Sequence, residues 1–234
     1  MTRLILKQLL LIAIAALASL TVILKGSIAQ EIQTIIPNQD NTMIESATGA
    51  LSNGQGPMLF VGRTNQPQDS IRRGVISFDI ANKIPAGSKI TSVTLQLTLE
   101  QTPSKNQSIE LHRLLKNWGE GKSFHPGGQG DRSTEGDATW LHTFYDSQLW
   151  SNPGGDFSEK VSAATTVGAQ GVYTWESTSE MVADVQEWLD SPDDNFGWLI
   201  LGNETISKTV KGFASSENPE PSAQPQLNVA YIEK

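Results

Sequence analysis

The stretch GDATWLHTFYDSQLW, residues 136–150, gathers rings and polar groups in a chain whose aromatic content is only 7%. A ring stacked on a sugar removes apolar surface from water, and polar neighbours bond to the hydroxyls. One stacked ring contributes about 1.5 kcal/mol, whereas millimolar affinity needs about 4 kcal/mol, so a platform requires at least two exposed rings. Tyr145 and Trp150, with His142 as the polar partner, are therefore candidate ligand-binding residues.

The same stretch has a second interpretation, as a plug for the end of a hydrophobic core. Its apolar and long side chains recur at spacings of one and four, which on a helical turn form a single stripe. The residues of this stripe are Trp140, Leu141, Phe144, Tyr145, Gln148 and Leu149. In this interpretation Trp140 is buried, and a buried Trp150 would assign both rings to the plug and leave no sugar platform.

Four carboxylates in the glycine-rich loop between residues 118 and 139 are the candidates for acid–base chemistry: Glu120, Asp131, Glu135 and Asp137. A glycosidase needs only two acids at the right separation. In a chain with 25 acidic residues, however, such a cluster is typical of solvated surface. The sequence also lacks a G-x-S-x-G motif and a closely spaced histidine pair, so we predict that the protein is not an enzyme.

A calcium site is an alternative interpretation of SPDDNFG, residues 191–197. Asp193, Asp194 and Asn195 carry oxygen ligands, but the segment lacks the spaced acids and terminal glutamate of an EF-hand loop. Asp and Asn also favour turns for local reasons. We expect a turn here and assign no metal ligand and no cofactor.

The N-terminal residues predict a signal peptide. Arg3 and Lys7 precede an apolar run from 9 to 24, and the small residues Ser27 and Ala29 suit cleavage before Gln30. This run is short against the roughly 20 residues that span a bilayer. We therefore expect export of the protein, with residues 1–29 as the signal, residues 30–39 as a lead-in and residues 40–234 as one domain.

Net charge and cysteine content limit the partners and the means of stabilisation. Removal of residues 1–29 would take away three basic residues and no acid, which changes the formal net charge from −8 to −11. Such a surface repels phosphates, so we expect no nucleic-acid partner and no membrane partner after cleavage. The chain has no cysteine, so the fold depends on its hydrophobic core.

Alternating apolar and polar residues predict an all-β fold. In KITSVTLQLTLEQ, residues 89–101, every second side chain from Val93 to Leu99 is apolar, and GVISFDI, residues 74–80, repeats the pattern. We expect these two strands to pair antiparallel through the turn at 84–88. Further strands are expected at 42–47, 58–63, 108–114, 171–177, 197–203, 209–215 and 226–232. Short strands of this number predict an antiparallel, jelly-roll-like β-sandwich.

One segment, STSEMVADVQEWLDSP at 177–192, has helical periodicity. Its apolar residues Met181, Val185, Trp188 and Leu189 form one stripe. Ser177 and Glu180 have the spacing of a capping box, and the proline at 192 ends the run. We expect a short amphipathic helix across one end or edge of the sandwich.

The order of several segments resembles the DNRLRE-domain family, which is grouped with the carbohydrate-binding modules. These segments are RRGVISFDIANKIPAGSKITSVTLQLTL, NWGEG, GDATW, MVADVQEWLD followed by NFGWLILGNE, and FASSE before PQLNVAY. The resemblance covers residues 40–232 and implies a secreted bacterial β-sandwich, with a polysaccharide such as alginate as the ligand of some members. Trp118, Trp188 and Trp198 lie in the matched segments and are expected in the core.

Two functions therefore follow as hypotheses. The first is a non-catalytic, extracellular polysaccharide-binding module. The second is a structural protein of the cell surface or extracellular matrix that contacts other surface proteins.

Overall fold

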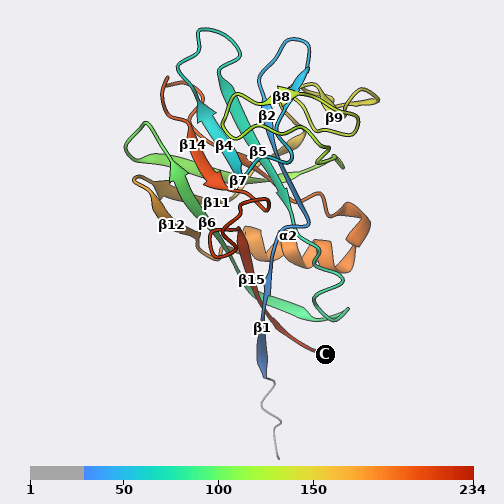
Figure 1. The fold of residues 1–234 in the computed structure, drawn as a ribbon. Coiled ribbons are helices and arrows are strands. Elements are labelled where there is room, and N and C mark those ends of the chain that lie inside the picture. Colours follow the sequence, from blue (N-terminus) through green and yellow to red (C-terminus); the bar gives the residue numbers. More distant parts are fainter. Residues whose placement is uncertain (1–28) are drawn as a thin grey trace, which may run out of the picture.

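The computed structural model describes residues 29–234, and in this range it is an all-β fold with one short α-helix (Figure 1). The strands pair antiparallel and form a sandwich with a strongly curved sheet, as the alternation predicted. The expected signal peptide lies outside the described residues, apart from Ala29. Within the described range, no helix has the length and apolar character needed to cross a bilayer.

The first layer of the sandwich is built around the long strand β6. β6 pairs with β15 and β14 along one side and with β12 along the other, β1 pairs with β15, and β4 pairs with β14. The bounds are β1 (Gln30–Ile35), β4 (Met58–Arg63), β6 (Lys89–Gln101), β12 (Gly171–Trp175), β14 (Lys211–Ala214) and β15 (Gln226–Ile232).

The second layer has the order β2, β5, β13, β7 and β11. Its bounds are β2 (Gln39–Ile44), β5 (Ile71–Ser77), β7 (Gln107–Leu114), β11 (Phe157–Val167) and β13 (Trp198–Leu201). β4 also pairs with β5, through Gly62 and Arg63, so the two layers form one continuous sheet at that corner. Gly62 has a φ of +102°, a conformation that side chains rarely adopt, which suits it to the bend.

The core lies between the two layers. The inward side chains of β6, from Val93 to Leu99, are buried at every second position. Ile76 of β5 and Ile200 of β13 belong to the same buried cluster. The predicted strand periodicity of β6 is therefore confirmed, and Trp188 and Trp198 are in this core, as expected.

Helix α2 (Ser179–Asp190) closes one end of this core. It contacts β6 of one layer and β11 of the other, and its four apolar residues are buried as the periodicity predicted. The side chain of Gln186 bonds to the backbone at both Ser88 and Ile90, which fixes the helix to the start of β6. The expected capping box is wrong, because Thr178 is the N-cap and accepts from the backbone N–H of Met181 at 3.0 Å. The Ser177 hydroxyl accepts from Val93 N instead.

One expectation about the sheets is wrong. The strands at 74–80 and 89–101 do not pair, because the segment between them crosses from one layer to the other and buries Phe78, Ile80 and Ile84 in the core. Within the segment at 30–39, residues Gln30–Ile35 form β1, which pairs with β15 along its whole length. In Figure 1, β1 and β15 extend together below the body of the fold.

Candidate functional site

The aromatic stretch at 136–150 lies on the outer face of the second layer. It contains the short strands β9 (His142–Phe144) and β10 (Gln148–Leu149), so the predicted helical stripe is wrong. Trp118 is buried in a core, as expected. This core is separate from the main one, and in it Trp118 and Trp150 cover Val75 and Leu199. These are the outward side chains of β5 and β13, whose neighbours Ile76 and Ile200 point into the main core.

The burial of the two tryptophans of the stretch, Trp140 and Trp150, is the reverse of the expected one. Trp150 is 5% exposed and its Nε1 donates to the carbonyl of Thr139 at 2.9 Å, so its expected exposure is wrong. Trp140 is only half-buried, and the guanidinium of Arg73 lies 4.8 Å from its ring centre. Glu204 holds Arg73 through two hydrogen bonds. Trp150 is therefore the covered ring of the stretch and Trp140 the accessible one.

His142 and Tyr145 do lie together. Their rings meet edge to face at 5.1 Å, and a ring nitrogen of His142 is 3.0 Å from the hydroxyl of Thr139. Tyr145 is half-buried, whereas His142 is largely buried. The structure thus brings His142 and Tyr145 together, but of the three predicted ligand-binding residues only Tyr145 is partly exposed, because His142 and Trp150 are both buried.

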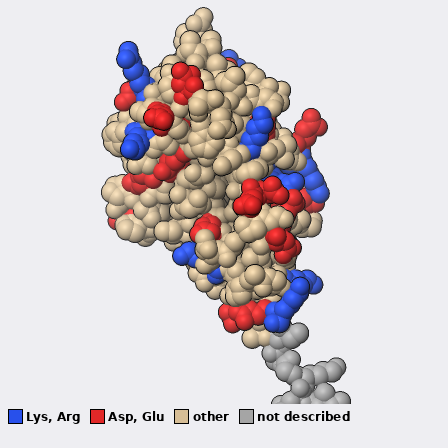
Figure 2. Space-filling view, turned by 90° about the vertical axis from the view of Figure 1, so that its right-hand side faces the viewer, with Lys and Arg blue, Asp and Glu red and all other residues tan. Residues whose placement is uncertain are grey.

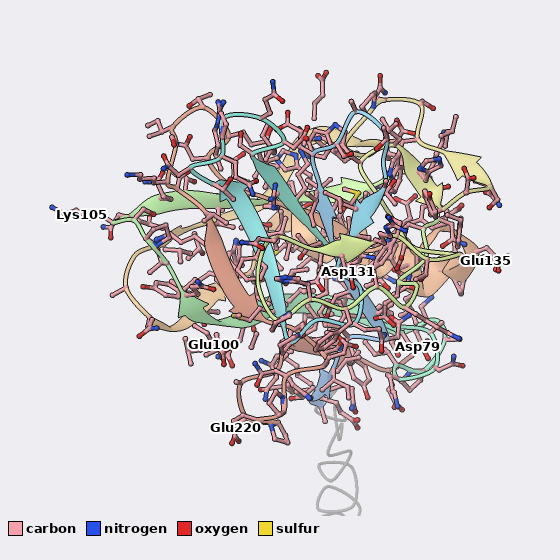
Figure 3. The ribbon with its side chains drawn as sticks, turned by 45° about the horizontal axis from the view of Figure 1, so that its top comes forward. Asp79, Glu100, Lys105, Asp131, Glu135 and Glu220 are labelled. Carbon is pink, nitrogen blue, oxygen red and sulfur yellow. The ribbon has the colours of Figure 1, made fainter. Side chains whose placement is uncertain are left out.

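The four carboxylates of the glycine-rich loop do not form a facing pair. Asp137 is fully buried and accepts from the hydroxyls of Ser123 and Thr134, both at 3.0 Å, so it organises the loop. Asp131 and Glu135 are exposed and lie well apart in Figure 3. Glu120 points elsewhere, toward the backbone of β2.

Glu120 belongs to a carboxylate cluster with the buried Asp40 and the half-buried Glu217. One Glu120 oxygen accepts from the backbone N–H of Asp40 at 3.0 Å, and Asp40 Oδ2 accepts from Ser216 N at 2.7 Å. Burial, with the nearby charge of Glu217, raises the pKa of Asp40 to about 8. Burial also raises the pKa of Glu120 to about 7 and that of Glu217 above its ordinary value. The cluster therefore holds protons at neutral pH.

Metal ligation receives no support from the described residues. Within 29–234, no three His, Asp or Glu side chains are placed to hold an ion. The segment at 191–197 contains a short 3₁₀-helix, Pro192–Asp194, as the expected turn, and Asn195 donates to the carbonyl of Phe78 at 2.7 Å.

A hollow lies elsewhere, at the corner where β4 and β14 meet the connections at 64–67, 101–103 and 128–129. Its volume is about 620 Å³, within the range of about 300–1,000 Å³ that is typical of ligand sites. A second hollow of about 320 Å³ adjoins it and shares Gln66, Pro67, Arg72 and Gln129. We call the two together the amide groove, because Asn65, Gln66, Gln101 and Gln129 line it with exposed carboxamides.

Arg72 forms part of the wall of the amide groove and positions one of these amides. It is 1% exposed, and its guanidinium donates to the carbonyls of Gly128, Asp69 and Ile71. Nη2 donates to Gln66 Oε1 at 3.0 Å. Because a guanidinium only donates, Gln66 presents its oxygen to Arg72 and keeps its NH₂ group for another partner. Burial lowers the pKa of Arg72 to about 10, so it stays charged at neutral pH.

Two glycines bring backbone onto the ring of Phe60 in the same groove. A Cβ at Gly128 would lie 3.0 Å from this ring, and one at Gly212 would lie 2.7 Å from it. A side chain at Gly212 would therefore displace the ring, and one at Gly128 would crowd it. The glycines fix the shape of the groove beside Phe60.

The connection that carries Thr102 and Pro103 is held from beneath by Lys211. This side chain is fully buried, and its ammonium donates to Thr102 Oγ1 at 2.8 Å and to the carbonyls of Ser104, Lys105 and Gly168 at 2.9–3.1 Å. Burial lowers its pKa. The ammonium thereby orders this side of the groove.

None of the groove residues was predicted from the sequence. The usable signal is the composition of two strand ends, TNQPQ at 64–68 and QTP at 101–103, which both combine proline with carboxamides. Neither segment contains an aromatic ring or a charged residue, and the two meet only because β4 and β6 both pair with β14.

No protein-family model matches the chain, and no curated protein matches it either.

Proposed function

We propose that the protein is a non-catalytic, extracellular polysaccharide-binding module and that the amide groove is its binding site. The groove with its exposed carboxamides is the observation that supports this function. A carboxamide both donates and accepts hydrogen bonds, as a sugar hydroxyl does. Pro67 and Pro103 are exposed and add apolar surface for the faces of sugar rings.

Export of the protein is part of this proposal. The expected cleavage before Gln30 would release a chain that begins at the first residue of β1. The fold would then keep every described strand. Intact-mass measurement of secreted material tests this, and material that retains residues 1–29 would contradict it.

Protein–protein contact is the alternative function, and the distribution of exposed apolar residues does not favour it. Ile32, Val172, Leu149 and Ile36 are the most exposed large apolar side chains. Ile32 lies on β1 and Ile36 directly follows it, whereas Leu149 and Val172 lie on β10 and β12, so the four are spread over three parts of the fold. The face in Figure 2 has basic side chains scattered among acidic ones, with no broad basic area.

A glycan microarray with matched variants tests the proposed function. Gln66→Ala and Gln129→Ala remove amides of the groove, whereas Gln148→Ala removes an exposed amide on β10 outside it. We expect reproducible binding that both groove variants weaken and that Gln148→Ala leaves unchanged. A blank array with self-association in solution would favour the structural alternative, and binding lost only in Gln148→Ala would place the site on the aromatic stretch.

A further inference from the structure

The hydrogen-bonding groups of the amide groove indicate the charge of its ligand. The larger hollow has four carboxamides and the hydroxyls of Thr64 and Thr102 along its walls. The side chains of Gln101 and Gln129 make no hydrogen bond within the described part of the chain, so their donors and acceptors are free. Neutral groups that both donate and accept match neutral hydroxyls.

The charged groups around the groove are unsuited to a carboxylate ligand. Arg72 is the only charged residue in the lining of the larger hollow, and four hydrogen bonds already engage its guanidinium. It therefore has no free fork for bidentate binding of a carboxylate. Asp69 lies in the lining of the smaller hollow and adds a negative charge there. Lys105, although close in sequence, projects away from the body of the fold in Figure 3.

The charge of the whole chain acts in the same direction. Its formal net charge is −8, so a polymer with a carboxylate on each sugar approaches a surface of its own sign. An uncharged polymer meets no such repulsion. The shared residues of the two hollows also make the groove longer than the larger hollow alone, which suits a stretch of chain rather than a single sugar.

We propose that the amide groove binds uncharged glycan chains and discriminates against uronate polymers. This inference rests on the proposed function and specifies its ligand class. Gln66, oriented by Arg72, donates to a ring or hydroxyl oxygen, while Gln101 and Gln129 bond to hydroxyls from two other segments.

Affinity electrophoresis of the folded chain in gels with soluble polymers tests the proposal. The neutral polymers are xylan, glucomannan and mixed-linkage glucan, and the anionic ones are alginate and polygalacturonate. We expect retardation by at least one neutral polymer, with little dependence on salt because no ion pair forms. Gln129→Ala should weaken it about tenfold, which corresponds to about 1.4 kcal/mol, and Gln148→Ala should not.

A gain of charge provides the complementary measurement. Gln129→Lys places an ammonium in the groove, so we expect it to bind a uronate polymer more tightly than the unmodified chain does, in a salt-sensitive way. Gln148→Lys adds the same charge outside the groove and controls for non-specific attraction.

The outcomes separate the two proposals. Retardation mainly by alginate or polygalacturonate, lost in Gln129→Ala, would overturn the neutral ligand class and keep the groove as a polysaccharide site. If the folded chain is retarded by none of the polymers, both proposals fail. Thermal melts of every variant show whether a lost interaction reflects a lost fold.

Discussion

Trp150 and Trp140 show how environment, rather than residue type, decides the role of a ring. Both rings belong to a single short stretch. Trp150 is buried in the second core together with Trp118, whereas Trp140 lies against Arg73 at the surface. The difference depends on contacts with residues far away in the sequence. Periodicity within the stretch contains no information about such contacts.

Replacement of Trp150 by alanine is expected to destabilise the protein strongly. The change empties the second core and leaves the carbonyl of Thr139 without its donor, with a cost of about 3–5 kcal/mol. At about 2–4 °C for each kcal/mol in a chain of this size, Tm should fall by roughly 10 °C. Differential scanning calorimetry measures the change.

Trp140→Ala is the matched comparison. Its ring is only half-buried, so its loss should lower Tm by a few degrees at most. A larger fall for Trp140→Ala than for Trp150→Ala would contradict the assignment of Trp150 to the second core. If the melts follow the expected order, the sugar platform of Tyr145 and Trp150 has no structural basis.

At the level of elements, strong periodicity predicted the structure best. β4, β6 and β15 have the predicted bounds. Buried positions alternate along β6 from Val93 to Leu99 and along the start of β15, whereas the four middle residues of β4 are all buried. β11 was missed because register shifts near Val161 interrupt its pairing with β7 and its side chains are small or polar. β1 was missed because Ile32, one of its two apolar residues, is exposed.

The pairing of the strands and the location of the amide groove were harder to predict from the sequence than the strands themselves. The sequence places 74–80 next to 89–101, but the chain crosses the core between them. The amide groove joins strand ends from four parts of the chain, and its residues have no periodic pattern. Hydrophobic patterns predict which side chains are buried, and they leave open which surface loops meet.

Thr178 at the start of α2 provides a test on the scale of one element. Its hydroxyl accepts from Met181 N and also donates to the carbonyl of Ser162 on β11, so it caps the helix and ties it to the second layer. Thr178→Ala should cost about 1–2 kcal/mol, from the cap and the lost bond together. Chemical denaturation measures this.

Ser179→Ala serves as the control for the helix start, because Ser179 is exposed and bonds only to the neighbouring Glu180. It should change the free energy of unfolding by less than about 0.5 kcal/mol. Equal effects of the two substitutions would show that Ser177 or Ser179, rather than Thr178, caps α2 in solution.

The whole molecule is linked across its layers by the carboxylate cluster. Asp40 lies on β2, Glu120 in the glycine-rich loop and Glu217 after β14, so three distant segments meet at groups that repel one another when ionised. Gln55 donates to Glu120 at 2.9 Å and Ser216 to Glu217 at 2.9 Å, which offsets only part of the cost of burial. The stability of the fold should therefore depend on the protonation of this cluster.

We expect the folded state to lose stability as the pH rises from about 4 to 8. In the unfolded chain, Asp40 and Glu120 ionise near their ordinary pKa values of 3.8 and 4.5, whereas in the fold burial raises these values to about 8 and 7. The folded state thus binds more protons across this interval, and stability falls with pH wherever the folded state binds more protons than the unfolded chain.

Asp156 acts in the opposite direction at lower pH. Burial opposes its ionisation, but hydrogen bonds led by that from Ser151 bring its pKa down to about 2. Its stabilisation is therefore lost as the pH falls from about 4 to 2.

Asp40→Asn should remove part of this pH dependence. The asparagine oxygen can still accept from Ser216 N, while its neutral amide no longer repels Glu217. At pH 8 the variant should therefore melt higher than the unmodified chain, and near pH 4, where Asp40 is protonated in the fold, the two should melt at similar temperatures. Glu135→Gln removes one exposed carboxylate without touching the cluster and controls for the change in net charge. Melting curves between pH 4 and 8 measure the difference. If Asp40→Asn and Glu135→Gln change the melting temperature by the same amount at every pH, Asp40 is ionised in the fold at neutral pH, and contacts other than those described compensate for its burial.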